Sequence, residues 1–150
     1  MRFFNIYNVY KPKNIIRITG DCPLLHFSLI DEVFKIHQDN RNDYTSNRGK
    51  INYVDGFDIE IFKSNLLVDA YKNAKSDFDK EHVTPYIINN INNIKKEFID
   101  FKYNLSKYKL SVDEQKDFNL IEKIFLNFKN NLETFDINDI NNYLINNYQL

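Results

Sequence analysis

A short β-branched run that ends in a tight turn constrains the fold of this chain more than any other feature. Residues 15–18 (Ile-Ile-Arg-Ile) are typical of a buried β-strand, and Gly20 and Pro23 end that strand abruptly. Asp21 therefore lies just past the predicted strand. Ligands of open α/β sheets bind there, and a carboxylate in that place can hold Mg²⁺ beside phosphate oxygens. The alternative role for Asp21 is a hydrogen bond within its own turn.

The rest of the chain alternates between helix-like and strand-like segments. Apolar residues at helical spacing predict helices over 1–10, 28–37, 66–74, 114–128 and 137–144. Strands are predicted over 15–18, 43–47, 57–61, 98–103 and 108–112, and an irregular acidic stretch over 77–86. This alternation favours an α/β fold with a mostly parallel sheet and helices on both faces. No linker divides the chain, so we expect residues 1–150 to form a single domain.

A second carboxylate is expected to lie beside the first. Asp113 follows the predicted strand over 108–112, as Asp21 follows the strand over 15–18, so both are expected to point into one crevice. Two converging carboxylates repel each other unless a cation lies between them. The structural alternative for Asp113 is the N-cap of the next helix, a role that is compatible with metal binding.

Other polar residues have ordinary structural interpretations. Ser28 stands where the helix over 28–37 needs an N-cap. His26 and His37 are expected to be surface or boundary residues, because no second His or Cys lies at metal-ligand spacing from them.

Bulk composition excludes several classes of protein. The 150 residues are 43% apolar and 27% charged, with a net charge of −1 and scattered Lys and Arg, which argues against a nucleic-acid surface. No apolar run approaches the length of a membrane span, and the N-terminus lacks a signal-peptide core. One cysteine excludes an internal disulfide. We therefore expect a cytoplasmic protein with neither a nucleic-acid nor a membrane partner.

Four segments also resemble one protein family, and they occur in the same order as in that family. The segments are Arg17–Leu24 (RITGDCPL), Asp55–Phe62 (DGFDIEIF), Glu81–Ile87 (EHVTPYI), and Lys109–Asp113 (KLSVD) leading to Asp117-Phe118. The chain resembles the cytidylyltransferases related to spore-coat polysaccharide biosynthesis proteins and acylneuraminate cytidylyltransferases. The resemblance implies a three-layer α/β/α, Rossmann-like domain of the nucleotide-diphospho-sugar-transferase type.

The resemblance also implies a reaction and a set of site residues. In this family a sugar oxygen attacks the α-phosphate of CTP, which yields a CMP-sugar and pyrophosphate. Asp21 and Asp113 match the catalytic metal-binding positions for Mg²⁺ or Mn²⁺. Four residues match the substrate-binding, acceptor-side segments, namely Asp58, Glu60, Glu81 and His82. Asp117 is matched one turn into the following helix, where it is expected to support the site indirectly.

Each acceptor-side residue has a structural alternative. Asp58 and Glu60 alternate with apolar neighbours after the Asp55-Gly56 turn, as on the solvated face of an edge strand. His82 can donate a hydrogen bond to a sugar hydroxyl or carboxylate, or it can hold its own loop in place.

The main departure of the chain from the family is an absence. The chain has only three glycines, Gly20, Gly49 and Gly56, and none lies in a Gly/Arg/Lys-rich loop of the kind that grips the triphosphate. We therefore expect the later part of a cytidylyltransferase domain without its N-terminal strands. It would act as a CMP-sugar-forming module in surface polysaccharide or glycan biosynthesis, paired with a separately encoded N-terminal half or as a homodimer. The alternative is a truncated, non-catalytic remnant that serves in binding or dimerisation.

A receiver-like phospho-acceptor domain built on Asp21 is a weaker alternative. It would require an additional acidic pair near the first strand and a lysine after a later strand, and neither is evident.

Overall fold

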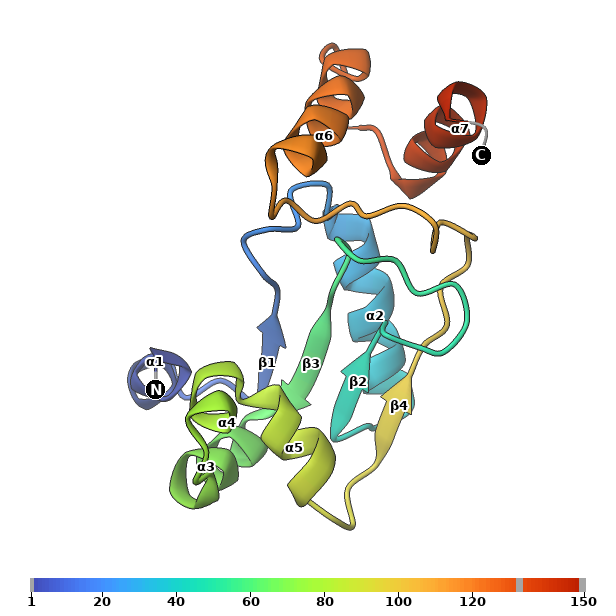
Figure 1. Cartoon of the computed structure of the whole chain (residues 1–150). Coiled ribbons are helices and arrows are strands. Elements are labelled where there is room, and N and C mark those ends of the chain that lie inside the picture. Colours follow the sequence, from blue (N-terminus) through green and yellow to red (C-terminus); the bar gives the residue numbers. More distant parts are fainter. Residues whose placement is uncertain (1, 132–133, 149–150) are drawn as a thin grey trace.

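The computed structural model describes residues 2–131 and 134–148, so Met1 at the start of the first expected helix lies outside the described residues. The helices are α1 (Arg2–Tyr10), α2 (Phe27–Asp39), α3 (Ser64–Asn73), α4 (Asp77–His82), α5 (Thr84–Asn90), α6 (Gln115–Asn127) and α7 (Ile137–Asn147). The strands are β1 (Asn14–Arg17), β2 (Tyr44–Ser46), β3 (Glu60–Lys63) and β4 (Lys96–Phe98). The predicted α/β class is confirmed (Figure 1).

The sheet formed by the described residues is mixed. Its strand order is β1-β3-β2-β4, and β3 is antiparallel to both of its neighbours while β2 and β4 are parallel. Three strands share one direction and β3 opposes them, so two of the three strand pairings are antiparallel and the sheet is mixed rather than mostly parallel. The reason lies in the connection over 47–59, which contains no helix. The chain re-enters the sheet from the edge at which β2 ended, so β3 must run backwards.

Helices cover both faces of the sheet, and two more lie beyond the strand ends (Figure 1). Side chains of β3 alternate between the faces: Ile61 packs with Val33 of α2, and Phe62 packs with Leu67 of α3 and Ile87 of α5. A third apolar cluster joins the loops beyond the carboxyl ends of β1 and β2 to α6 and α7. Its fully buried members include Leu105, Leu110, Ile124 and Leu144.

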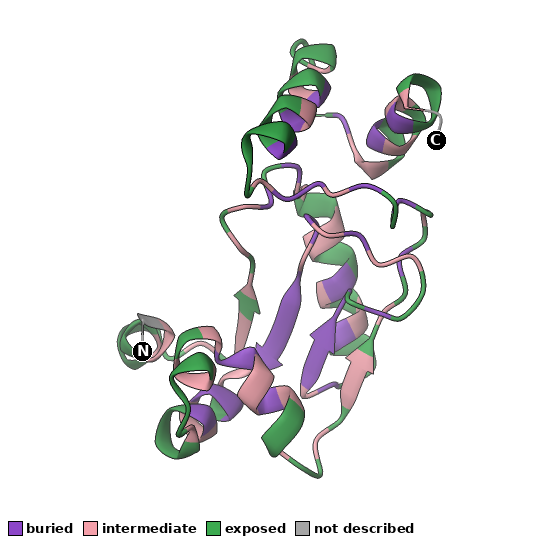
Figure 2. Ribbon diagram, in the orientation of Figure 1, coloured by how far each residue is buried: buried purple, intermediate pink, exposed green. Residues whose placement is uncertain are grey.

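The two strands that carry the first motifs differ in burial (Figure 2). β1 lies at the edge of the described sheet, and Ile16 and Ile18 are 42% and 50% exposed. The prediction of a strand is confirmed here, but the prediction that it is buried is wrong. β3 lies between β1 and β2, and Glu60 is only 2% exposed. The edge-strand alternative for Asp58 and Glu60 is therefore wrong.

Three predicted strands are shifted, reduced or replaced. The strand expected over 57–61 shares only Glu60 and Ile61 with β3. The strand expected over 98–103 is limited to β4, which ends at Phe98. The segment over 108–112 forms a single bridge, between Asp55 and Lys109, and no ladder. It passes beyond the strand ends, where its amide groups find loop carbonyls: Leu110 donates to Asp55 at 2.8 Å and Val112 to Asp21 at 2.9 Å.

The acidic stretch over 77–86, which was expected to be irregular, contains α4 and the start of α5. Ser76 caps α4 by accepting the amide of Asp79 at 3.0 Å. Pro85 lies in the first turn of α5, where a missing amide costs no helical hydrogen bond.

Two predicted N-caps move by one or two residues. His26, rather than Ser28, caps α2, because its Nδ1 atom accepts the Ser28 amide at 3.3 Å. Glu114, rather than Asp113, caps α6 and forms a capping box with Asp117. Asp136 caps α7 by accepting the amides of Asn138 and Asp139.

Candidate active site

The four motif segments meet at the edge of the sheet where β1, β2 and β4 end. The strand register pairs Arg17 and Ser46 with Glu60, so β3 begins at the edge where β1 and β2 finish. The Val112–Asp21 and Leu110–Asp55 hydrogen bonds join the last motif to the first two. The third motif joins through Thr84, whose hydroxyl donates to Glu60 at 3.1 Å.

Gly56 permits the closest of these approaches. Its φ is +116°, and a Cβ atom at this position would lie 2.2 Å from the carbonyl carbon of Leu110. Any other residue would push the 109–113 segment away from the Asp55-Gly56 turn.

Asp21 lies in the turn that follows β1. A hydrogen bond from the Thr19 side chain holds the pKa of Asp21 below its usual value, so the carboxylate stays charged at neutral pH. Asp21 also borders a hollow of about 660 Å³ that Val112, Phe118 and Phe125 line on the side of α6. The charged group therefore lies beside open space that a substrate can enter.

Glu60 is the centre of a buried polar group that we call the Glu60 cluster (Glu60, Arg17, Tyr44 and Thr84). Its Oε1 accepts the Tyr44 hydroxyl at 2.6 Å, and its Oε2 accepts Arg17 Nη1 at 2.5 Å and the Thr84 hydroxyl. Burial and the neighbouring carboxylate raise the pKa of Tyr44. Both oxygens of Glu60 are thus occupied by donors from three separate elements.

Asp58 has internal partners as well. The Tyr53 hydroxyl donates to Asp58 Oδ1 at 2.9 Å, and Arg48 Nη1 lies 3.9 Å from Oδ2. The guanidinium of Arg48 is 5.2 Å from the centroid of the Tyr53 ring. Burial raises the pKa of Asp58. Asp58 holds Arg48 and Tyr53 in place, and the exposed half of Arg48 faces solvent.

Glu81 and His82 lie at the C-terminal end of α4. Glu81 is exposed, and the ring of His82 packs against Phe78 with centroids 4.6 Å apart. Val83 follows with a φ of 64°, which is unusual for a buried β-branched residue. This conformation ends α4 and directs Thr84 toward Glu60, so the motif residues reach the cluster through Thr84.

Asp113 belongs to a second charged group, which we call the Lys109 cluster (Lys109, Asp113 and Asp117). Lys109 Nζ lies 2.5 Å from Asp113 Oδ2 and 2.7 Å from Asp117 Oδ2. Asp117 Oδ2 also accepts the amides of Asp113 and Glu114, at 3.1 Å and 3.0 Å. These contacts hold the pKa of Asp117 below its usual value, with the Lys109 hydrogen bond as the main cause.

Comparison with known proteins decides the family. A family model described as "Cytidylyltransferase" matches residues 1–147. The chain belongs to the cytidylyltransferase family.

Individual relatives agree with this membership. An uncharacterized protein of Methanocaldococcus jannaschii is 38% identical over 121 residues, which cover 79% of this chain and 49% of that protein. The spore coat polysaccharide biosynthesis protein SpsF of Bacillus subtilis is 32% identical over 120 residues, covering 78% of this chain and 49% of SpsF. The chain therefore spans about half the length of the curated relatives it matches.

A solved structure shows the same fold. The cytidylyltransferase from Leptospira borgpetersenii serovar Hardjo-bovis superposes with a TM-score of 0.89 at 26% identity, over 97% of this chain and 61% of that one. The mixed sheet and its helices therefore form the Rossmann-like fold of a cytidylyltransferase.

A divalent metal in this cytidylyltransferase chain would need ligands from both the protein and the substrate. Among residues 2–131 and 134–148, no three His, Cys, Asp or Glu side chains form a group that could hold a metal. Mg²⁺ commonly takes one or two carboxylates and completes its shell with water and substrate phosphates. Asp21 borders the hollow, whereas the Asp113 side chain, which is 57% exposed, pairs with Lys109 and is not among the residues that line the hollow. The Val112–Asp21 backbone hydrogen bond joins their two segments, and each carboxylate could supply one ligand beside substrate phosphates.

Sequence reasoning missed the basic and hydroxyl groups of this edge. Arg17, Thr84 and Lys109 lie inside the matched segments, so their place in the motifs was a signal that could have identified them. Arg48 and Tyr53 lie in a polar loop whose sequence shows no pattern, and their role emerges only from contacts with Asp58.

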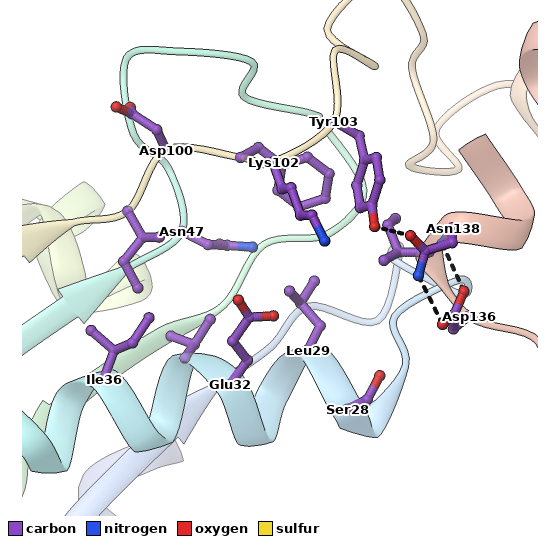
Figure 3. A pocket seen from close by; sticks show the side chains of 14 residues that line it. Ser28, Leu29, Glu32, Ile36, Asn47, Asp100, Lys102, Tyr103, Asp136 and Asn138 are labelled. Carbon is purple, nitrogen blue, oxygen red and sulfur yellow. Dashed lines mark hydrogen bonds between the residues drawn. The ribbon is translucent and has the colours of Figure 1, made fainter. Parts of the chain in front are cut away.

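A further cavity lies on the α2 side of the sheet (Figure 3). It has a volume of about 210 Å³ and lies between α2, residues 99–103 and the start of α7. The side chains of Lys102 and Glu32 point into it from opposite walls, and the Tyr103 hydroxyl donates to Asn138. None of the matched-motif side chains lines this cavity.

Within the described part of the chain, no helix has the length and apolar character needed to cross a membrane.

Proposed function

We propose that this chain forms part of an enzyme that transfers CMP from CTP to a sugar, for surface polysaccharide or glycan biosynthesis. In this reaction the sugar oxygen replaces pyrophosphate on the α-phosphorus. The observation that carries the proposal is the meeting of four family segments at one sheet edge, joined by the Val112–Asp21, Leu110–Asp55 and Thr84–Glu60 hydrogen bonds.

In this proposal Asp21 and Asp113 are the carboxylates that hold Mg²⁺ or Mn²⁺ against the nucleotide phosphates. When bound, the metal neutralises charge on the phosphates and on the pyrophosphate leaving group. The task of the protein is mainly positioning and electrostatic stabilisation, as in other phosphoryl transfers.

Two of the acceptor-side residues are proposed to contact the sugar directly, and the other two to support the site indirectly. Glu81 and His82 lie at a helix end beside Thr84 and are proposed to contact the sugar. Both oxygens of Glu60 accept internal donors, and Oδ1 of Asp58 accepts the Tyr53 hydroxyl while Oδ2 lies 3.9 Å from Arg48. We propose that they serve the substrate indirectly, by holding Arg48 and Thr84 at the edge of the site.

The proposal is tested by Mn²⁺ binding to the 150-residue chain, measured by electron paramagnetic resonance. Asp21→Asn and Asp113→Asn each keep size and an acceptor oxygen but remove the charge that a hard cation needs. We expect both to weaken Mn²⁺ binding, whereas Asp31→Asn, at an exposed position on α2, leaves it unchanged. Unchanged affinity in both site variants would contradict the metal assignment.

Catalysis is tested by pyrophosphate release from CTP with nine-carbon, eight-carbon and simple amino sugars. Because none of the three glycines lies in a triphosphate-binding loop, we expect no turnover by these residues alone. Turnover by the chain on its own would contradict the expectation that this loop is supplied from elsewhere.

A non-catalytic role in binding or dimerisation is the second candidate. The observation that favours it is exposed apolar surface on neighbouring elements, with Val9 and Tyr10 on α1 and Ile16 on β1. Because β1 is an edge strand of the described sheet, it offers backbone groups to another chain. Light scattering after size exclusion tests this candidate, which predicts a dimer or a complex. A monodisperse monomer would contradict it.

A further inference from the structure

We propose that Lys109 is a resident cation of the catalytic centre, which neutralises Asp113 until a divalent metal displaces it. The inference rests on the proposed function, because it takes Asp113 as a metal ligand. Before the metal binds, Lys109 would compete with it for Asp113. After the metal binds, Lys109 would supply a positive charge for the substrate phosphates.

The two carboxylates that Lys109 contacts are unequal partners. Lys109 Nζ lies 2.5 Å from Asp113 Oδ2 and 2.7 Å from Asp117 Oδ2. The side chain of Asp113 is 57% exposed and that of Asp117 is 5% exposed. An ion pair open to water is weak, because solvent screens it and the flexible side chains lose entropy by forming it. The Asp113 contact is therefore the one that a divalent cation can replace.

Asp117 keeps its place when that replacement occurs. Its Oδ2 atom also accepts the amides of Asp113 and Glu114, and it completes the capping box of α6. Lys109 can therefore leave Asp113 and stay anchored to Asp117, next to the ligand that it gave up.

The backbone around Lys109 is also fixed. The Asp55–Lys109 bridge and the Leu110–Asp55 hydrogen bond tie this segment to the Asp55-Gly56 turn. The displacement thus needs only a rotation of the lysine side chain. The ammonium group would then have a donor available for phosphate oxygens, which lysine binds as a point charge.

Capping alone does not account for the contact with Asp113. Two backbone amides already engage Asp117, and Glu114 supplies the cap of α6. A lysine needed only to neutralise Asp117 would have no reason to lie 2.5 Å from the exposed Asp113.

The test is the Mn²⁺ dissociation constant of the 150-residue chain at low ionic strength, measured by electron paramagnetic resonance. Lys109→Met removes the positive charge that contacts Asp113, the proposed metal ligand. We therefore expect this variant to bind Mn²⁺ roughly tenfold more tightly than the parent. Lys109→Arg keeps the charge and should change the affinity little. The matched control is Lys116→Met, because Lys116 pairs with the exposed Glu114 and lies outside the Lys109 cluster. That variant should change the affinity by about twofold or less.

A second variant guards against structural damage. Lys109→Met leaves the buried Asp117 without its ammonium partner, so the double variant Lys109→Met/Asp117→Asn is measured beside it. In both variants we expect tighter Mn²⁺ binding, an effect that loss of structure would not produce.

The outcomes separate this inference from the proposed function. Equal or weaker Mn²⁺ binding in both Lys109 variants, with weaker binding in Asp113→Asn, overturns the role of Lys109 alone. Unchanged binding in Asp113→Asn overturns the assignment of Asp113 as a metal ligand, and this inference with it.

Discussion

The Glu60 cluster and the Lys109 cluster are built from the same parts and have opposite properties. Each places a carboxylate from a family segment beside a basic side chain and further donors. Glu60 is 2% exposed and both of its oxygens are occupied, whereas Asp113 is 57% exposed and has one oxygen paired. The comparison teaches that burial, and not the presence of a motif, separates a carboxylate that organises a site from one that can receive a ligand.

The difference follows from where each residue lies in the fold. β3 is flanked by β1 and β2 and covered by α3 and α5, so a charge on it must be neutralised internally. Asp113 lies beyond the strand ends, just before the N-cap of α6, where water reaches it.

The largest effect that tests this comparison is expected from Glu60→Gln. The variant leaves the half-buried Arg17 without its charge partner, and breaking such a buried pair costs roughly 3 kcal/mol of unfolding free energy. Denaturant unfolding measures this change. Glu81→Gln, at an exposed position, is the control and should lie within about 0.5 kcal/mol of the parent. A loss below about 1 kcal/mol in Glu60→Gln would mean that the cluster contributes little to the fold.

A smaller effect is expected from Tyr44→Phe, which removes the 2.6 Å donation to Glu60 Oε1. Loss of a buried hydrogen bond to a charged group costs about 1.5–3 kcal/mol of unfolding free energy. Tyr86→Phe is the matched control, because its hydroxyl reaches Asp69 at only 3.4 Å in a partly buried place. Equal losses in the two variants would argue against a special place for the Glu60 cluster.

The pH dependence of stability should have opposite signs at Asp58 and Asp21. Burial raises the pKa of Asp58, so its contribution to stability is present at acidic pH and is lost as pH rises through the folded pKa. As the pH rises from 4 to 7, the free energy of unfolding of Asp58→Asn should therefore increase relative to that of the parent.

At Asp21 the Thr19 hydrogen bond lowers the pKa, so its contribution is present at neutral pH and is lost as pH falls through the folded pKa. Asp21→Asn should lose stability relative to the parent at pH 7, and the difference should shrink toward pH 3. Thermal unfolding of the three proteins across this range measures both effects. The same sign of pH dependence in both variants would contradict the pKa directions.

The smallest effect on stability is expected from Asp113→Asn. Because Glu114 provides the cap of α6, the variant should stay within about 0.5 kcal/mol of the parent in denaturant unfolding. The variant thus separates ligand binding from folding, since its Mn²⁺ affinity is expected to fall. A stability loss comparable to that of Glu60→Gln would erase the distinction between the two clusters.

Local patterns were enough to predict most elements and the family. Apolar spacing predicted α1, α2, α3, α6 and α7, and β-branched or alternating runs predicted β1, β2 and β3. The family segments indicated cytidylyltransferase membership, because each motif is a contiguous run of residues. The prediction that residues 77–86 are irregular was wrong. The two helices there, α4 and α5, are short, and they depend on a Ser cap and on Val83 at positive φ.

The sequence by itself determined most of the helices, the presence of β1 and β2, and which residues belong to the family segments, because those signals lie between neighbours in the chain. Tertiary structure decided the reversed direction of β3, the burial of Glu60, and the partners of Asp113. It also turned the strand expected over 108–112 into a segment held by Asp21 and Asp55. These outcomes depend on hydrogen bonds and ion pairs between residues far apart in the chain, and such partners exist only once the sheet and its loops have come together.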